Sequence, residues 1–195
     1  MYRLDQKTLF EWLKSPRRKP LLLRGARQVG KSTLVRMFAD ANELDLLEIN
    51  LERHLYLNDV FKTLDIPLIL RNLLSITGKP CTAKSLIFLD EIQATPNAIA
   101  ALRYFYEDKP ELPVIATGSL LEFALSDHEF SMPVGRVQTL HLGPVIFEEM
   151  LLEVAPHLLE SLKNMELGKP LPEATRRPLP VGRHSACSYL DRWRL

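Results

Sequence analysis

The chain has 195 residues, of which 46% are hydrophobic, and its 25 basic and 24 acidic residues leave a formal net charge of +1. This length and composition suit one α/β domain with a sizeable core, and they exclude a fibrous, disordered or disulfide-stapled protein. The near balance of charge also excludes a polycation that binds nucleic acid or membranes over its whole surface.

The first half of the chain alternates helical and strand-like patterns. Residues 4–14 have apolar side chains at near-helical spacing, so we expect a helix there. The run "LLLRG", residues 21–25, is typical of a strand buried on both faces, and a helical stripe follows over 34–41. Residues 46–52 favour a second strand. The apolar stripe over 66–78, which ends in a glycine, predicts another helix.

The alternation continues in the next sixty residues. We expect buried strands over 85–92 and 112–119 and an alternating fifth strand over 135–142. Residues 95–108 predict a helix, with a threonine suited to an N-cap followed by proline at the first helical position. A short helix is expected over 120–125.

Strands that alternate with helices at this spacing predict an α/β fold, a parallel sheet covered by helices on both faces. Ligands bind such sheets at the carboxyl ends of the strands. Polar residues follow the apolar runs "LLLRG", "LIFL" and "VIA", which is where this rule requires a site.

The pattern changes in the last quarter of the chain. It becomes purely helical from about residue 146, and from Gly168 it loses periodicity and is rich in proline and arginine. We therefore expect a first domain over residues 1–150, the start of a helical segment over 151–167, and a disordered or aberrant tail over 168–195.

The segment after the first strand fits the phosphate-loop pattern G-x-x-x-x-G-K-[ST] in full. Its glycines permit backbone angles and close approach that side chains would block, and its N–H groups converge on phosphates at a helix N-terminus. The lysine would reach the β- and γ-phosphates, and the serine would ligate Mg²⁺. The predicted nucleotide-binding residues here are Gly25, Ala26, Arg27, Gln28, Val29, Gly30, Lys31, Ser32 and Thr33.

Two acids end the strand "LIFLDE" and suit a magnesium–nucleotide site. Asp90 is placed to organise the metal together with Ser32. Glu91, which points differently from its neighbour, would orient and deprotonate the attacking water.

Two further elements complete the predicted site. The strand "VIATGS" brings a hydroxyl, that of Thr117 or Ser119, near the γ-phosphate as a sensor, and the sequence does not separate the two. Arg136 is the best candidate for the extra positive charge that phosphoryl transfer needs, in cis or from a neighbouring subunit. Arg103 is a weaker candidate.

With these motifs in place, the chain resembles the AAA-type P-loop ATPases of the additional-strand, catalytic-glutamate class. More narrowly, "LLLRGARQVGKSTLVRMFA", "LIFLDEIQATPNAIAALRYFYED" and "VIATGSLLEFAL" are similar to bacterial and archaeal predicted ATPases that carry a C-terminal domain of unknown function. The resemblance covers about residues 3–165.

The resemblance implies a three-layer P-loop NTPase with five strands in the order 5-1-4-3-2, because the Thr117 strand lies between the phosphate-loop strand and the Asp90 strand in that class. It also implies ATP and Mg²⁺ as ligands, with the site roles given above. Members of the family continue into a further domain, so we expect that this chain is a truncated or frameshifted product. A natural short member with a disordered tail is the alternative.

Three functions follow from this site. The leading expectation is a Mg²⁺-dependent ATP hydrolase that couples hydrolysis to a conformational change felt by a partner or by the missing domain. The possible partners are another protein or a second copy of the chain. The alternatives are a nucleotide-binding switch with little turnover and a P-loop phosphotransferase. The basic tail gives only weak support for DNA as a partner.

The N-terminus and the cysteines indicate a cytoplasmic protein. The first twenty residues have no apolar core of signal-peptide type, and no window holds the roughly 18 apolar residues of a membrane helix. Cys81 and Cys187 have neither metal-ligand nor disulfide spacing, which fits a reducing compartment. We expect no membrane partner.

Overall fold

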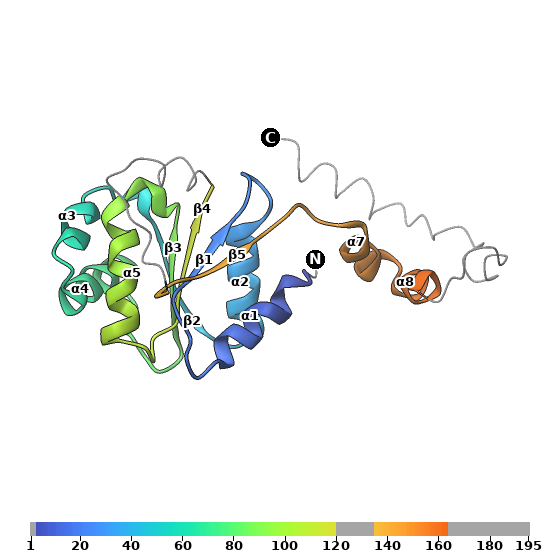
Figure 1. Cartoon of the computed structure of the whole chain (residues 1–195), viewed down its shortest axis with the longest axis horizontal. Helices are drawn as coiled ribbons and strands as arrows, with labels where there is room; N and C mark the ends of the chain where they lie inside the picture. Colours follow the sequence, from blue (N-terminus) through green and yellow to red (C-terminus); the bar gives the residue numbers. More distant parts are fainter. Residues whose placement is uncertain (1–2, 120–134, 164–195) are drawn as a thin grey trace. The chain divides into compact units, whose positions relative to one another are not determined.

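Five strands form one parallel sheet in the computed structural model, which describes residues 3–119 and 135–163 (Figure 1). The strands lie in the order β2-β3-β4-β1-β5, and all four pairings between them are parallel. Read from the other edge this order is 5-1-4-3-2, so the predicted sheet is confirmed. The strands are β1 (Leu21–Arg24), β2 (Asp45–Asn50), β3 (Ser85–Asp90), β4 (Val114–Gly118) and β5 (Gln138–His141).

Helices cover both faces of the sheet and make a three-layer structure, as Figure 1 shows. The first two helices pack on one face and the next three on the other. Two short 3-10 helices, η1 (Leu51–Arg53) and η2 (Ile92–Ala94), follow β2 and β3. The helices of the layers are α1 (Asp5–Lys14), α2 (Lys31–Ala41), α3 (Leu57–Lys62), α4 (Ile66–Thr77) and α5 (Pro96–Asp108).

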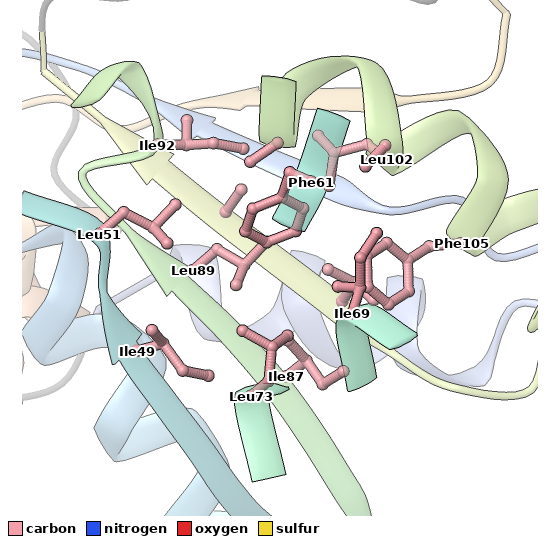
Figure 2. Packing of buried hydrophobic residues seen from close by; sticks show 14 of the residues in the cluster. Ile49, Leu51, Phe61, Ile69, Leu73, Ile87, Leu89, Ile92, Leu102 and Phe105 are labelled. Atoms are coloured by element: carbon pink, nitrogen blue, oxygen red, sulfur yellow. The ribbon is translucent and has the colours of Figure 1, made fainter. Parts of the chain in front are cut away.

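The apolar strands produce two hydrophobic clusters because successive side chains point to opposite faces of a sheet. In β1, Leu22 packs in the cluster with α3, α4 and α5, whereas Leu21 and Leu23 pack in the cluster with α1 and α2. All six residues of β3 are buried, as expected of a strand with strands and helices on every side. Figure 2 shows the first cluster, in which Leu89 lies close to Phe61.

Two of the predicted helix-end signals are confirmed and one is not. Gly78 closes α4 with φ of 65°, and Asp65, which was not predicted, caps the start of that helix by accepting from the Leu68 N–H at 3.0 Å. Pro96 is the first residue of α5, as predicted. Thr95 occupies the N-cap position, but its side chain makes no capping bond, and its buried Oγ1 has no hydrogen-bond partner in the described part of the chain.

The sequence did not predict α3. This helix has six residues, and Leu57 and Phe61 are its two buried positions, which is too short a stripe to stand out as a period. The helix predicted over 120–125 lies outside the described residues.

A second compact unit begins at Val145 and is described as far as residue 163. It contains α7 (Phe147–Val154) and α8 (Pro156–Lys163), which share a small cluster of Leu151, Ala155 and Leu159. The predicted domain boundary at 150 falls within α7, and the predicted tail lies outside the described residues, so the domain assignment stays a prediction. Among the described helices, none is long and apolar enough to span a membrane.

Replacing Leu89 with alanine tests the core. Leu89 is fully buried, and its removal should lower the free energy of unfolding by about 3 kcal/mol because it leaves a cavity between β3 and the helices. Leu55, 60% exposed, is the matched control, and Leu55→Ala should change it by less than about 0.5 kcal/mol. Urea denaturation measures both, and equal losses would contradict this packing.

Candidate functional site

The three predicted polar segments meet at the carboxyl ends of the strands. Strands β3, β4 and β1 are neighbours in that order and run parallel, so the residues after their carboxyl ends lie side by side. The register places Thr117 opposite Leu23 of β1 and Ala116 opposite Leu89 of β3. The phosphate-loop segment, the two acids and the hydroxyl residues therefore share one site.

The loop between β1 and α2, residues 25–30, contains three residues in left-handed backbone conformations. Gly25 has φ of 143°, Gln28 has φ of 64°, and Gly30 has φ of 90° at the N-cap of α2. A loop that turns in this way directs successive backbone N–H groups to one side, and the helix N-terminus adds a favourable field for anions. These backbone conformations are compatible with the predicted role of residues 25–33 as an anion cradle.

Gly25 is required by a close approach as well as by its φ. A Cβ built on Gly25 would lie 2.2 Å from the carbonyl oxygen of Leu142, the residue after β5. The Leu142 N–H donates to the Arg24 carbonyl at 2.8 Å, which fixes that approach. The strand at the edge of the sheet therefore braces the base of the loop.

Lys31 folds back over the loop. Its Nζ donates to the carbonyl oxygens of Gly25 at 3.0 Å and Ala26 at 2.8 Å. Burial lowers the pKa of Lys31 from its ordinary value, and the negative charges of Glu91 and Asp90 oppose that effect. The ammonium group therefore lies within the loop that it was predicted to serve, where it feels the charges of the two acids.

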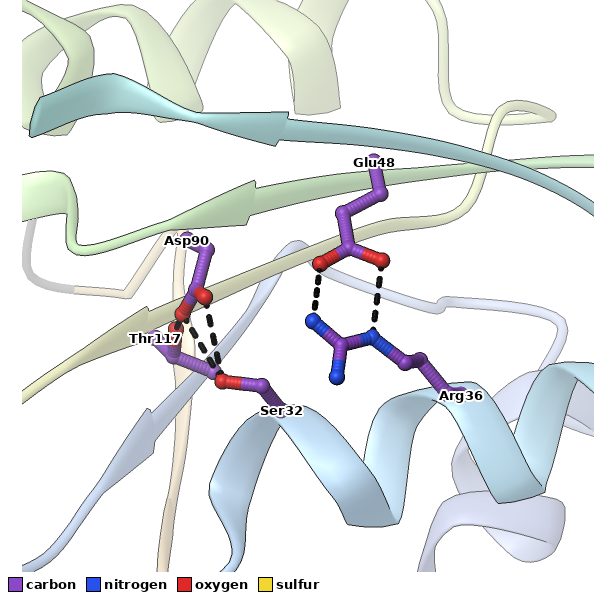
Figure 3. A network of polar contacts seen from close by, with 5 residues as sticks. All are labelled: Ser32, Arg36, Glu48, Asp90 and Thr117. Carbon is purple, nitrogen blue, oxygen red and sulfur yellow. Dashed lines mark hydrogen bonds and ion pairs between the residues drawn. The ribbon is translucent and has the colours of Figure 1, made fainter. Parts of the chain in front are cut away.

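Asp90 receives hydroxyl donors from two elements (Figure 3). Ser32 Oγ, on the first turn of α2, donates to both carboxylate oxygens of Asp90 at 3.1 and 3.0 Å. Thr117 Oγ1, on β4, donates to Asp90 Oδ1. Asp90 is 7% exposed and Thr117 is completely buried. A carboxylate beside a serine hydroxyl is a set of oxygen ligands that suits Mg²⁺.

Glu91 makes contacts that are separate from those of Asp90. Its backbone is left-handed, with φ of 54°, so the chain turns sharply after β3. Its Oε2 accepts from Gln93 Nε2 at 2.6 Å and from Ser119 Oγ at 3.3 Å. The structure thus distinguishes the two hydroxyls that the sequence left equivalent, since Thr117 contacts Asp90 and Ser119 contacts Glu91.

An ion pair joins α2 to β2 beside this cluster. Arg36 donates to Glu48 through Nε at 2.9 Å and through a second nitrogen at 2.5 Å, as Figure 3 shows. The hydrogen bond to Glu48 raises the pKa of Arg36. Because the pair is partly exposed, it contributes little to stability but helps to fix the orientation of α2.

Arg136 does not reach the loop of its own chain. It precedes β5, whose first residue Gln138 pairs with Leu21 at the start of β1, so it lies at the amino ends of the strands, away from the loop. Its Nε donates to Glu107 Oε1 at 3.0 Å, as does Arg103 Nε. Hydrogen bonds from Arg136 and then Arg103 lower the pKa of Glu107. Neither arginine joins the Asp90 cluster.

Arg3 supports the site and was missed by sequence reasoning. It is 6% exposed, and its guanidinium donates to the Val29 carbonyl at 2.9 Å and the Gly143 carbonyl at 2.9 Å. It therefore ties the loop to the segment after β5. A lone arginine near the N-terminus belongs to no motif, so no sequence signal marks it. Gln93, two residues after Glu91, was also missed, because its contact with that carboxylate depends on the turn after β3.

Replacing Gly25 with alanine should weaken binding of the predicted nucleotide about tenfold or more, because the new Cβ would displace either the loop or the Leu142 carbonyl. Gly78→Ala is the matched control: Gly78 also has positive φ, but its Cβ would meet nothing within 4 Å. That control should lose only about 1 kcal/mol of stability and keep its affinity. Titration with a fluorescent ATP analogue measures both, and unchanged affinity in Gly25→Ala would count against the close approach.

Replacing Arg3 with alanine should lower the free energy of unfolding by about 2 kcal/mol, because it leaves two carbonyl groups without their charged donor. Arg17 is exposed, and Arg17→Ala should change that energy by less than about 0.5 kcal/mol. Chemical denaturation compares the two variants. A smaller loss for Arg3→Ala than for Arg17→Ala would contradict the supporting role.

Comparison with known proteins identifies the family. Residues 17–151 match the family model described as AAA domain. No curated protein matches the chain. Among solved structures, the chain is similar to the Walker-type ATPase of Pyrococcus abyssi, with 22% sequence identity and a TM-score of 0.47 over 85% of this chain. The alignment covers 59% of that structure. The family model matches more than half of the residues of this chain, so the chain belongs to the AAA domain family of nucleotide-binding P-loop ATPases.

Proposed function

We propose that the site at the carboxyl ends of the strands binds ATP with Mg²⁺ and hydrolyses the bond between the β- and γ-phosphates. The observation that carries this proposal is the pair of separate acid environments beside the phosphate loop. Asp90 is bonded to Ser32 and Thr117, whereas the neighbouring Glu91 is bonded to Gln93 and Ser119. A metal-organising acid and a base need such separate surroundings, because one carboxylate must stay with the metal while the other accepts a proton.

The residues present fit both ligands. The loop offers a backbone cradle with three left-handed residues and no Cβ at Gly25, which suits phosphate oxygens. Ser32 Oγ and the Asp90 carboxylate lie within 3.1 Å of each other and would hold the metal. Magnesium bound there would neutralise charge on the phosphate oxygens during transfer.

The protein residues have distinct roles in the proposed reaction. Lys31 exchanges its bonds to the Gly25 and Ala26 carbonyls for contacts with the β- and γ-phosphates. Glu91 takes a proton from the attacking water. Thr117 keeps the Asp90 carboxylate oriented, and Ser119 links the state of Glu91 to the end of β4.

Hydrolysis is proposed to drive a conformational change. The contacts of Lys31 within the loop and of Ser119 with Glu91 both lie where the γ-phosphate would bind, so they would differ between the ATP and ADP states. The end of β4 and the loop are therefore the elements that we expect to move.

The partner that receives this movement is proposed to be a protein or a second copy of the chain. Arg136 lies at the amino ends of the strands with a side chain that is 46% exposed. Within this proposal it therefore supplies positive charge only to the site of a neighbouring subunit. DNA remains a weakly supported partner, because its support in the sequence is the basic tail, which lies outside the described residues.

Replacing Glu91 with glutamine should lower kcat for phosphate release about 100-fold or more while ATP still binds, because the amide cannot accept the water proton. Lys31→Ala should instead weaken ATP binding, since it removes the charge that contacts the phosphates. Glu11, exposed on α1, provides the matched control Glu11→Gln, which should retain the wild-type rate. Phosphate release and binding of a fluorescent ATP analogue measure the two quantities.

The same experiment distinguishes the other functions. Tight ATP binding with equal, near-zero turnover in wild type and Glu91→Gln would replace the hydrolase with a nucleotide-binding switch. Failure of wild type to bind ATP, or binding that Lys31→Ala leaves unchanged, would overturn the assignment of the site.

A further inference from the structure

Gln93 lies two residues after the proposed base, in a hydrogen-bonded turn. It lies in the middle of η2, whose backbone is held by bonds from Ala94 N to Glu91 O and from Thr95 N to Ile92 O, both at 3.0 Å. The side chain of Ile92 is completely buried in the core. The backbone of Gln93 is therefore fixed from both sides, and its side chain is partly buried.

The contact with Glu91 determines which way the Gln93 amide points. Gln93 Nε2 donates to Glu91 Oε2 at 2.6 Å. An ionised carboxylate only accepts hydrogen bonds, so the NH₂ end of the amide must face it. The carbonyl end, Oε1, must then point away from the carboxylate.

Gln93 Oε1 is buried and has no hydrogen-bond partner among the described residues. Solvent does not reach this oxygen, so the Gln93 side chain acts on the site through the contact of its Nε2 with Glu91. That contact is a hydrogen bond to a charged acceptor, which is stronger than one between neutral groups.

We infer that Gln93 is a positioning residue for hydrolysis: its Nε2 holds the Glu91 carboxylate in the direction in which that carboxylate accepts a proton from the attacking water. This inference rests on the proposed function. In the step, the water oxygen bonds to the γ-phosphorus as the bond from that phosphorus to the bridging oxygen breaks, and ADP leaves with the electron pair. Glu91 takes one proton of the water, and the other proton stays on the oxygen that bonds to phosphorus.

The contacts of Glu91 agree with this arrangement. In the described part of the chain, both hydrogen bonds to this carboxylate end on Oε2, from Gln93 and Ser119. The remaining oxygen is therefore the one that can take the proton, and the two donors fix its direction. Such orientation matters because a misplacement of about 1 Å can cost about 100-fold in rate.

The test compares Gln93→Ala, Gln93→Glu and the matched control Gln138→Ala, whose glutamine is exposed at the opposite end of the sheet. Gln93→Ala removes both ends of the amide, and Gln93→Glu keeps its size but loses the donor. Both Gln93 variants should lower kcat about tenfold or more. Their affinity for a fluorescent ATP analogue and their midpoint of thermal unfolding should be unchanged. Gln138→Ala should match wild type in all three.

A double variant separates positioning from a structural role. Because Gln93 acts through the Glu91 carboxylate, Glu91→Gln with Gln93→Ala should be about as slow as Glu91→Gln alone in single-turnover hydrolysis. If the rate losses of the two single variants multiply in the double variant, the inference is overturned. A loss of affinity and stability equal to the loss of rate would also overturn it. So would a faster Gln93→Ala, because the amide would then restrain the base.

The outcomes also distinguish this inference from the function on which it rests. Turnover that falls in Glu91→Gln but is unaffected in Gln93→Ala would overturn the inference and leave the hydrolase in place. Absence of turnover in wild type would overturn both.

Discussion

The carboxylate of Asp90 is almost completely buried, and hydroxyl groups from α2 and β4 donate to it. Burial of a charge is costly unless hydrogen bonds compensate for it. The elements that carry Ser32 and Thr117 must therefore keep their positions beside β3. The position of β4 between β1 and β3 makes this possible. If β1 lay directly beside β3, Thr117 would be taken away from the carboxylate. The sheet order and the chemistry of the site are thus consequences of one arrangement.

The phosphate loop depends on segments that are far away in the chain. Arg3 holds the Val29 carbonyl from the N-terminal side, and the backbone of Leu142 lies against Gly25 from the end of β5. Arg3 also bonds to Gly143, so these two supports are joined to each other. The loop is therefore held in its left-handed conformation by both ends of the first compact unit, and not by the phosphate-loop residues alone.

The two acids at the end of β3 are neighbours in sequence but have different surroundings because the chain turns at Glu91 into a left-handed conformation. An extended backbone would simply alternate the two side chains across the sheet. The turn instead brings Glu91 to Ser119 and Gln93, away from the buried face that holds Asp90. Strain of this kind is retained in proteins where a function needs the side chain in one place.

The sequence by itself determined the five strands, the phosphate loop and the acid pair, because apolar periodicity and the loop motif are local along the chain. Its family resemblance also predicted the sheet order that the structure has. The tertiary structure decided that Thr117 contacts Asp90 while Ser119 contacts Glu91. It also decided that Arg136 lies at the amino ends of the strands and that Arg3 supports the loop. These contacts join residues that are distant in sequence, and their geometry depends on strand register and side-chain packing, which a local pattern does not contain.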